Sequence, residues 1–303
     1  MSIVCAGAAE PPLWVWTVWL VAAIAVGVVG LLRPRRNGTI EPNFAELAAS
    51  PSPVTSPPAN GADAEDAAAS RRDLQRVPLL AVTALISFCA WVGTQLVYVS
   101  IRQPAAAEAV RAWSSADLAR LSLLSFVVGW VIGFGLLVYG RGVQAIGFGW
   151  RRAPSGLLAG AIGIFVALPV VFFCLQATLT VLGWLMIEHP QKHELLVVLE
   201  GSAGRSVQVM AIVSAVFAAP LFEEMLFRGC VQGGLRRATG SRWVAILVAS
   251  LLFAVIHPPW TIPPIFAFSV LLGLVYDRTR NLWATTTMHA LFNAFAIFNN
   301  GMN

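Results

Sequence analysis

Three polar groups interrupt the otherwise apolar C-terminal part of the sequence. Their ionisable and amide side chains are Glu223, Glu224, Arg228, His257, His289 and Asn293. Ionisable groups are costly inside a bilayer and usually mark function there. Carboxylates and histidines can activate water by general acid–base catalysis, and the same groups can ligate a metal ion. These residue types therefore predict a hydrolytic or metal-binding site.

The spacing within each group predicts which side chains share a helix face. Residues four apart are neighbours on an α-helix, as Glu224 and Arg228 are, and also His289 and Asn293. Arg228 is thereby placed to pair with Glu224 and to offset the cost of an unpaired buried charge. Consecutive residues point about 100° apart on a helix, so Glu223 and Glu224 are predicted to have different roles.

Counting along the chain predicts that the first two groups meet. Glu223 and His257 are equally distant in sequence from Gly240, the centre of a polar turn. At about 1.5 Å per residue, both lie roughly 25 Å from that turn and face each other. This geometry requires the first helix to continue to about Arg237. His289 follows a second basic turn and is predicted to reach a compatible depth.

The composition is that of a polytopic membrane protein. Hydrophobic residues make up 57% of the chain and charged residues 12%, against roughly a quarter in soluble domains. A spanning helix needs about 20 apolar residues, which predicts an all-α bundle of about eight transmembrane helices. The candidate spans lie near 13–32, 78–101, 121–140, 156–186, 207–227, 243–257, 262–276 and 282–298.

The sequence divides into three predicted parts. Residues 1–32 form an accessory transmembrane helix, 33–77 a disordered polar linker, and 78–303 a membrane-embedded core. A proline-rich run from His257 to Pro264 must break the helix that precedes it. Arginines concentrate in alternate loops, so the positive-inside rule predicts an outside N-terminus. The arginine and alanine richness suggests a bacterial plasma membrane.

The basic residues fall in short loops and form no continuous stripe, which argues against a nucleic-acid partner. The lipid bilayer is the predicted environment. His189 and His193 lie in a polar loop with a proline between them and are predicted to have no ligand role. Neither H-E-x-x-H nor G-x-S-x-G occurs, which argues against two other classes of intramembrane protease.

At the polar groups the sequence resembles a known family. The motifs E-E-x-x-x-R, F-x-x-x-H and H-x-x-x-N follow one another between Glu223 and Asn293, and the resemblance covers roughly 150–298. In this order they resemble the CAAX-protease and bacteriocin-processing family of intramembrane proteases, which includes the type II prenyl-protein endopeptidases. The resemblance implies a helical bundle and an endopeptidase acting on membrane-associated or lipidated peptides and proteins.

The resemblance also implies roles for the site residues. Glu223 would be the general base that activates water with His257, and His289 with Asn293 would stabilise the oxyanion. Glu224 and Arg228 would organise the site. Family members are described as metalloproteases, which implies a divalent metal such as zinc held by Glu223, His257 and His289.

Two questions stay open at this level. A buried glutamate can activate water without a metal, so the metal is not required by the residue types. The same scaffold can also serve a non-proteolytic role, as a bacteriocin self-immunity or assembly protein that binds a partner in the membrane. A transferase acting on lipidated protein ends is a third hypothesis. A transporter is disfavoured, because no matching pair of broken helices occurs in two halves.

Overall fold

The computed structural model describes residues 74–102, 114–187 and 204–300. Among these residues every regular element is helical and no strand occurs. The predicted accessory helix 1–32 and nearly all of the predicted linker 33–77 lie outside the described residues. The loop that carries His189 and His193 also lies outside them.

The helices follow one another in chain order. They are α3 (Val77–Arg102), α4 (Ser115–Tyr139), η1 (Trp150–Arg152), α5 (Ala153–Trp184), α7 (Arg205–Val213), η2 (Ser214–Ala218), α8 (Ala219–Glu224), η3 (Met225–Gln232), α9 (Gly233–Thr239), α10 (Arg242–Val255), η4 (Pro259–Thr261), α11 (Ile262–Thr279) and α12 (Leu282–Asn300). The elements α7 to α9 join end to end, and we call the whole of Arg205–Thr239 the central helix.

Five described helices are long and apolar enough to cross a membrane. They are Val77–Tyr98, Ser115–Tyr139, Trp150–Trp184, Arg205–Thr239 and Pro259–Thr279. The predicted all-α polytopic membrane bundle is therefore confirmed. The predicted number of eight spans is not confirmed, because α10 has 14 residues, α12 is not among the five, and the region 13–32 is not described.

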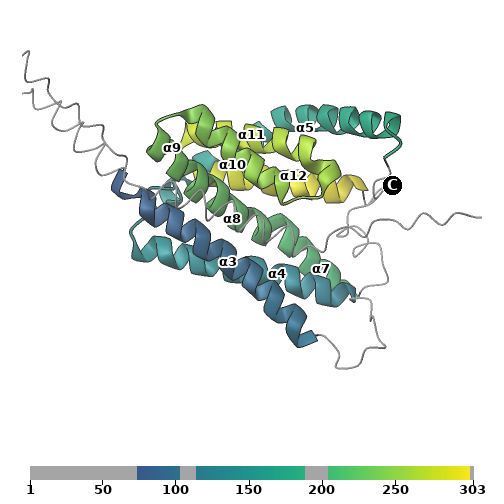
Figure 1. Cartoon of the computed structure of the whole chain (residues 1–303), viewed down its shortest axis with the longest axis horizontal. Helices are drawn as coiled ribbons and strands as arrows, with labels where there is room; N and C mark the ends of the chain where they lie inside the picture. Colours follow the sequence, from purple (N-terminus) through teal and green to yellow (C-terminus); the bar gives the residue numbers. More distant parts are fainter. Residues whose placement is uncertain (1–73, 103–113, 188–203, 301–303) are drawn as a thin grey trace, which may run out of the picture.

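The central helix lies between two groups of helices (Figure 1). The pair α3 and α4 packs against one side of it, while α10, α11 and α12 pack on the other side, with α5 against α11 and α12. All three polar groups are carried by the central helix and by the second group. The arrangement therefore brings the predicted site residues to one interface, between the central helix, α10 and α12.

Aromatic packing fixes the central helix against the first pair. The Phe222 ring stacks on Trp91 of α3 at a centroid distance of 6.0 Å and tilts against Phe126 of α4 at 5.8 Å. A Cβ atom at Gly129 would lie 2.6 Å from the Phe222 ring, so glycine makes room for it. This packing anchors the residue that directly precedes Glu223.

Two predicted chain breaks are confirmed. The turn after the central helix is centred on Gly240, which adopts a φ of +69° in the left-handed region that favours glycine. The helix α10 ends at Val255, and the proline-rich run forms the short 3₁₀ turn η4 before α11 begins. The central helix continues past Arg228 to Thr239, as the counting argument requires.

The central helix contains two π-helical segments that the sequence analysis did not predict, η2 and η3. Such segments widen the turn and are frequent at functional sites. Pro220 follows η2 and has no amide hydrogen to donate to a carbonyl of the preceding turn. The irregular helix therefore leaves backbone carbonyls that other groups must satisfy, and it surrounds both glutamates.

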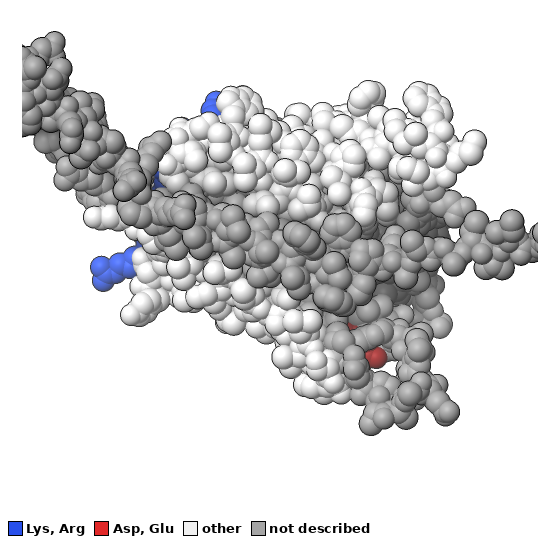
Figure 2. Space-filling view, viewed as in Figure 1, with Lys and Arg blue, Asp and Glu red and all other residues white. Residues whose placement is uncertain are grey.

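Charged side chains gather at the ends of the bundle. In Figure 2, the visible basic side chains of the described residues, all of them arginines, lie at the end where α9 is found, and the described surface that this view shows between the ends is almost without charge. At this end Asp277 is shared by three arginines, at distances of 3.5 to 3.8 Å. They are Arg236, Arg242 and Arg280. One basic end and apolar sides are typical of a protein embedded in a bilayer.

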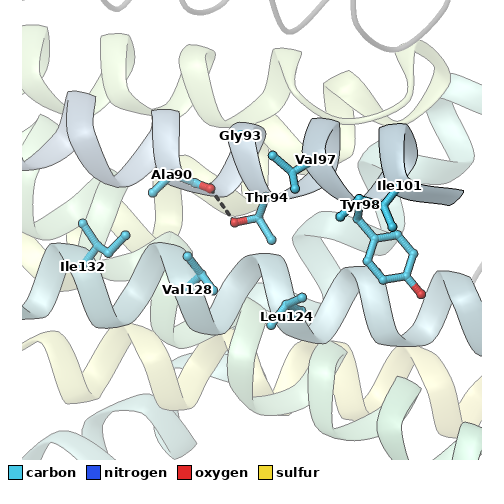
Figure 3. A pocket seen from close by; sticks show the side chains of 9 residues that line it. All are labelled: Ala90, Gly93, Thr94, Val97, Tyr98, Ile101, Leu124, Val128 and Ile132. Atoms are coloured by element: carbon cyan, nitrogen blue, oxygen red, sulfur yellow. Dashed lines mark hydrogen bonds between the residues drawn. The ribbon is translucent and has the colours of Figure 1, made fainter.

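An apolar groove of about 450 Å³ runs between α3 and α4 (Figure 3). Its lining residues are Ala90, Gly93, Thr94, Val97, Tyr98, Ile101, Leu124, Val128 and Ile132. The Thr94 hydroxyl donates to the Ala90 carbonyl at 2.8 Å, so it offers little polarity to the groove. None of the predicted catalytic residues lines it.

Packing of α5 against α12 gives a first testable prediction. A Cβ atom at Gly160 would lie 2.5 Å from the Ala284 carbonyl oxygen and 2.9 Å from the Met288 amide nitrogen, and backbone atoms cannot move aside singly. We expect Gly160→Ala to destabilise the bundle by about 1–3 kcal/mol, seen as a lower thermal midpoint in detergent. The control is Gly135→Ala, whose added Cβ meets nothing within 4 Å. Equal midpoints for both variants would contradict this packing.

Candidate active site

A buried ion pair forms the centre of the candidate site. The Arg228 Nε donates to Glu224 Oε2 at 3.2 Å, and both side chains are completely buried. The two residues are one helical turn apart, as their spacing predicts. Charges of opposite sign in direct contact lower the cost of burying each of them in an apolar bundle. The Phe253 ring covers the guanidinium, at 5.3 Å from ring centroid to Arg228 Cζ.

His289 on α12 lies between the two glutamates. Its Nδ1 is 3.1 Å from Glu224 Oε1, and its Nε2 is 3.7 Å from Glu223 Oε2. A carboxylate paired with arginine can only accept, so Nδ1 carries the hydrogen that bonds to Glu224. A carboxylate that holds a histidine in this way fixes both its tautomer and its orientation.

The two glutamates have different surroundings, as their adjacent positions predict. Glu224 makes contacts with both Arg228 and His289, and none of its side chain is exposed. The Glu223 side chain retains 11% exposure and has no bond as short as those of Glu224. Of the two carboxylates, Glu223 is therefore the more accessible.

Phe253 connects His257 to the rest of the site. Its ring centroid lies 4.8 Å from that of His257 and 5.7 Å from that of His289. The His257 Nδ1 is 2.8 Å from the Phe253 carbonyl oxygen, which can only accept a hydrogen bond. Nδ1 therefore carries the hydrogen in the neutral ring, and Nε2 is the basic nitrogen. His257 is half-buried, unlike His289.

Asn293 of α12 contacts the central helix, as His289 does, but it bonds to a different group there. Its amide donates to the Ala215 carbonyl in the π-helical segment η2 at 2.8 Å. Ala215 lies five residues before Pro220. In a π-helix the amide of residue 220 would donate to the Ala215 carbonyl, but proline has no amide hydrogen. Asn293 thus satisfies a backbone carbonyl that the helix itself leaves without a donor. This bond uses one of the two amide hydrogens of Asn293.

The predicted metal ligands do not form a compact set in this geometry. Within the described residues, no group of three or more His, Cys, Asp or Glu side chains lies close enough together to hold a metal ion. His289 uses Nδ1 on Glu224 and His257 uses Nδ1 on the Phe253 carbonyl, and metal-bound histidines make contacts of this kind as well. Because the three side chains are not gathered into one set, the described residues do not fit a zinc site as arranged here, and zinc stays a prediction of the resemblance.

The structure brings most of the predicted residues together. Glu223, Glu224, Arg228 and His289 are in direct contact, and His257 joins them through Phe253. The sequence analysis missed Ser269 of α11, whose buried hydroxyl accepts a hydrogen bond from Arg228 Nη2 at 2.9 Å. A lone serine in an apolar helix gives no signal of its own.

Comparisons with known proteins agree with this site. Residues 205–295 match the type II CAAX prenyl endopeptidase Rce1-like family. The membrane-embedded CAAX protease MroQ of Staphylococcus aureus (strain USA300) is 37% identical over 84 residues, which cover 26% of this chain. The match spans only about a third, 34%, of the length of that relative. No solved structure matches the chain. The resemblance predicted from the three motifs is confirmed over the region that carries them.

The buried ion pair gives the second prediction. In Arg228→Met, the carboxylate of Glu224 stays buried without its cation, so we expect a loss of about 3–5 kcal/mol in the free energy of unfolding. The double variant Arg228→Met with Glu224→Gln removes the charge and is expected to recover part of this loss. Thermal unfolding in detergent measures both. A double variant no more stable than Arg228→Met would show that the pair does not govern the stability of this site.

Proposed function

From the match of residues 205–295 to the CAAX endopeptidases, we propose that the chain is an intramembrane endopeptidase. It hydrolyses peptide bonds of membrane-associated peptides or proteins with water that Glu223 and His257 activate. The match of this region to a protease family and the membrane bundle support the general class. The observation that carries the mechanism is the unequal burial of Glu223 and Glu224.

Glu223 acts as the general base in this proposal. A water molecule gives a proton to the Glu223 carboxylate while its oxygen attacks the carbonyl carbon of the scissile bond. The basic Nε2 of His257 assists in orienting or deprotonating this water. When the tetrahedral intermediate collapses, the protonated Glu223 returns the proton to the leaving nitrogen, and the C–N bond breaks. Glu223 is thereby regenerated as a carboxylate, and a new water molecule replaces the one consumed.

His289 and Asn293 stabilise the negative charge that develops on the carbonyl oxygen. When both ring nitrogens of His289 carry hydrogen, Nδ1–H donates to Glu224. The Nε2–H then lies on the side of Glu223 and donates to the carbonyl oxygen of the substrate. The second amide hydrogen of Asn293 serves the same oxygen. Glu224 and Arg228 organise the site, because together they hold His289 in place without being reached by the substrate.

The substrate reaches this site from the cytoplasmic side in the proposal. The basic end of the bundle carries Arg236, Arg242 and Arg280, which the positive-inside rule assigns to the cytoplasm. The site lies along the central helix away from that end, below the level of the headgroups. Peptides or proteins held at the membrane, including lipidated ones, are the substrate class that could reach it. The orientation places the N-terminus outside, in a bacterial plasma membrane.

A divalent metal such as zinc belongs to the proposal only through the resemblance. Glu223, His257 and His289 are the residues that would hold it, and it would supply a Lewis acid for the carbonyl oxygen. The observed arrangement does not gather these three side chains, so the steps above use the protein's own groups alone.

The third prediction tests the general base. Glu223→Gln keeps the size of the side chain but cannot take a proton, so we expect cleavage of a peptide library to fall by about 10²–10⁴-fold. The thermal midpoint is expected to stay close to that of the wild type, because Glu223 has no bond as short as those of Glu224. Cleavage by purified protein in detergent and thermal unfolding are measured side by side.

Asp117→Asn is the matched control for this experiment. It makes the same change of a carboxylate into an amide, at the start of α4 on another part of the bundle. It should leave cleavage unchanged. Full activity of Glu223→Gln would exclude Glu223 as the base. A wild type without cleavage, together with normally folded variants, would favour the non-proteolytic role in immunity or assembly.

The fourth prediction concerns the metal. Since the described residues gather no set of three ligands, we expect the wild type to keep its cleavage rate after dialysis against a chelator. The same samples are then supplied with zinc and assayed again. Loss of activity on chelation with recovery on adding zinc would replace the metal-free mechanism. It would assign the ion to Glu223, His257 and His289, and substituting any one of them should then lower zinc content.

A further inference from the structure

A row of polar contacts continues from the candidate site towards the basic end of the bundle. On the central helix, residues at intervals of four carry polar side chains, namely Arg228, Gln232 and Arg236. On α11 the same interval gives Ser269, Gly273 and Asp277. The central helix and α11 run parallel, with the antiparallel α10 between them in sequence, so equal intervals keep the two rows in register.

Each member of one row contacts its counterpart in the other. The three contacts are Arg228 Nη2 to Ser269 Oγ at 2.9 Å, Gln232 Nε2 to the Gly273 carbonyl oxygen at 2.9 Å, and Arg236 Nε to Asp277 Oδ1 at 3.8 Å. We call this set the polar ladder. It begins in the completely buried interior and ends at Arg236, whose side chain is 33% exposed.

The middle contact of the ladder depends on a glycine. A Cβ atom at Gly273 would lie 3.1 Å from Gln232 Oε1 and 3.0 Å from a methyl carbon of Ile246. The glycine therefore lets the Gln232 amide approach the backbone of α11. Through this bond and the outer ion pair, α11 is held in a fixed register against the central helix, one turn and two turns beyond Arg228.

The innermost contact restrains the guanidinium of Arg228. This group is completely buried, its Nε is used by Glu224, and its Nη2 is used by Ser269, while Nη1 has no hydrogen-bond partner among the described residues. Ser269 is therefore one of two hydrogen-bonding side chains that set the orientation of Arg228. Arg228 in turn holds Glu224, and Glu224 holds His289.

We propose that Ser269 is a positioning residue of the active site, which acts through Arg228 and Glu224 on the orientation of His289. The inference rests on the proposed peptidase function and adds to it a residue outside the three motifs. Gln232 and Gly273 support Ser269 by keeping α11 in register. Ser269 itself is separated from the reacting atoms by two side chains, so its loss changes the turnover rate and leaves substrate binding in place.

The test compares two serine substitutions. Ser250 on α10 is also completely buried, and its hydroxyl has no hydrogen-bond partner, so Ser250→Ala removes the same atom without a contact to lose. We expect Ser269→Ala to lower kcat by about tenfold with KM unchanged, since a hydrogen bond to a charged group is lost. Ser250→Ala is expected to leave kcat within about twofold. Equal kcat values for both variants would overturn the proposal.

A double-mutant cycle shows whether Ser269 acts through Arg228. Arg228→Lys keeps the positive charge beside Glu224 but lacks the planar fork that reaches two partners at once. In that background, Ser269→Ala should cause no further loss of kcat. An additional tenfold loss would mean that Ser269 acts by another route, and the proposal would fall.

The thermal midpoints of the four proteins of this cycle and of Ser250→Ala separate this inference from the proposed function. If the wild type cleaves no substrate, the peptidase function fails, and the positioning contact is judged from stability. Non-additive midpoints in the cycle would then retain Ser269 as the residue that orients Arg228. Additive midpoints, or a Ser269→Ala midpoint equal to that of Ser250→Ala, would overturn it.

Discussion

The structure depends on one buried group of charges in a bundle that is otherwise apolar. Arg228 and Glu224 are both completely buried, and such charges are tolerated only where partners surround them. The partners come from two other helices, His289 of α12 and Ser269 of α11. Because each of these bonds has to form, the charges determine how closely α11 and α12 approach the central helix. The same hydrogen bonds therefore form the candidate site and set the packing of these helices.

The same constraint divides the polar residues into two kinds. Glu224 and Arg228 bond to each other, and Asn293 uses one amide hydrogen to supply the donor that Pro220 lacks. Glu223 and His257 keep partial exposure, and the contact of Glu223 with His289 is longer than that of Glu224. This difference supports the proposed role of Glu223 and His257 in activating water. A carboxylate in this position needs a rigid surrounding, which its buried neighbour provides.

Much of this arrangement could be predicted from the sequence, because it follows from helical periodicity. Intervals of four predicted the pair Glu224 and Arg228. Counting from Gly240 predicted which positions of the central helix and α10 lie at the same height. Phe227 and Phe253, also equidistant from Gly240, are in edge contact at 5.2 Å. The π-helical segments could not be predicted, since they depend on how neighbouring helices satisfy freed carbonyls. Ser269 could not be singled out either, because only the register between the central helix and α11 gives it a partner.

Parallel register explains why a site of this kind sits at depth and not at the basic end. Two parallel helices with polar residues at equal intervals make one contact per turn, and each contact fixes the height of the next. At the outer end, Asp277 can exchange its arginines with water and ions, so that contact alone contributes little. Towards the interior, water and ions can no longer replace a protein partner. Each hydrogen bond there restricts the orientation of its side chains more strongly. In the proposed mechanism, the orientation of His289 is consequently set at the innermost step, where Arg228 is completely buried.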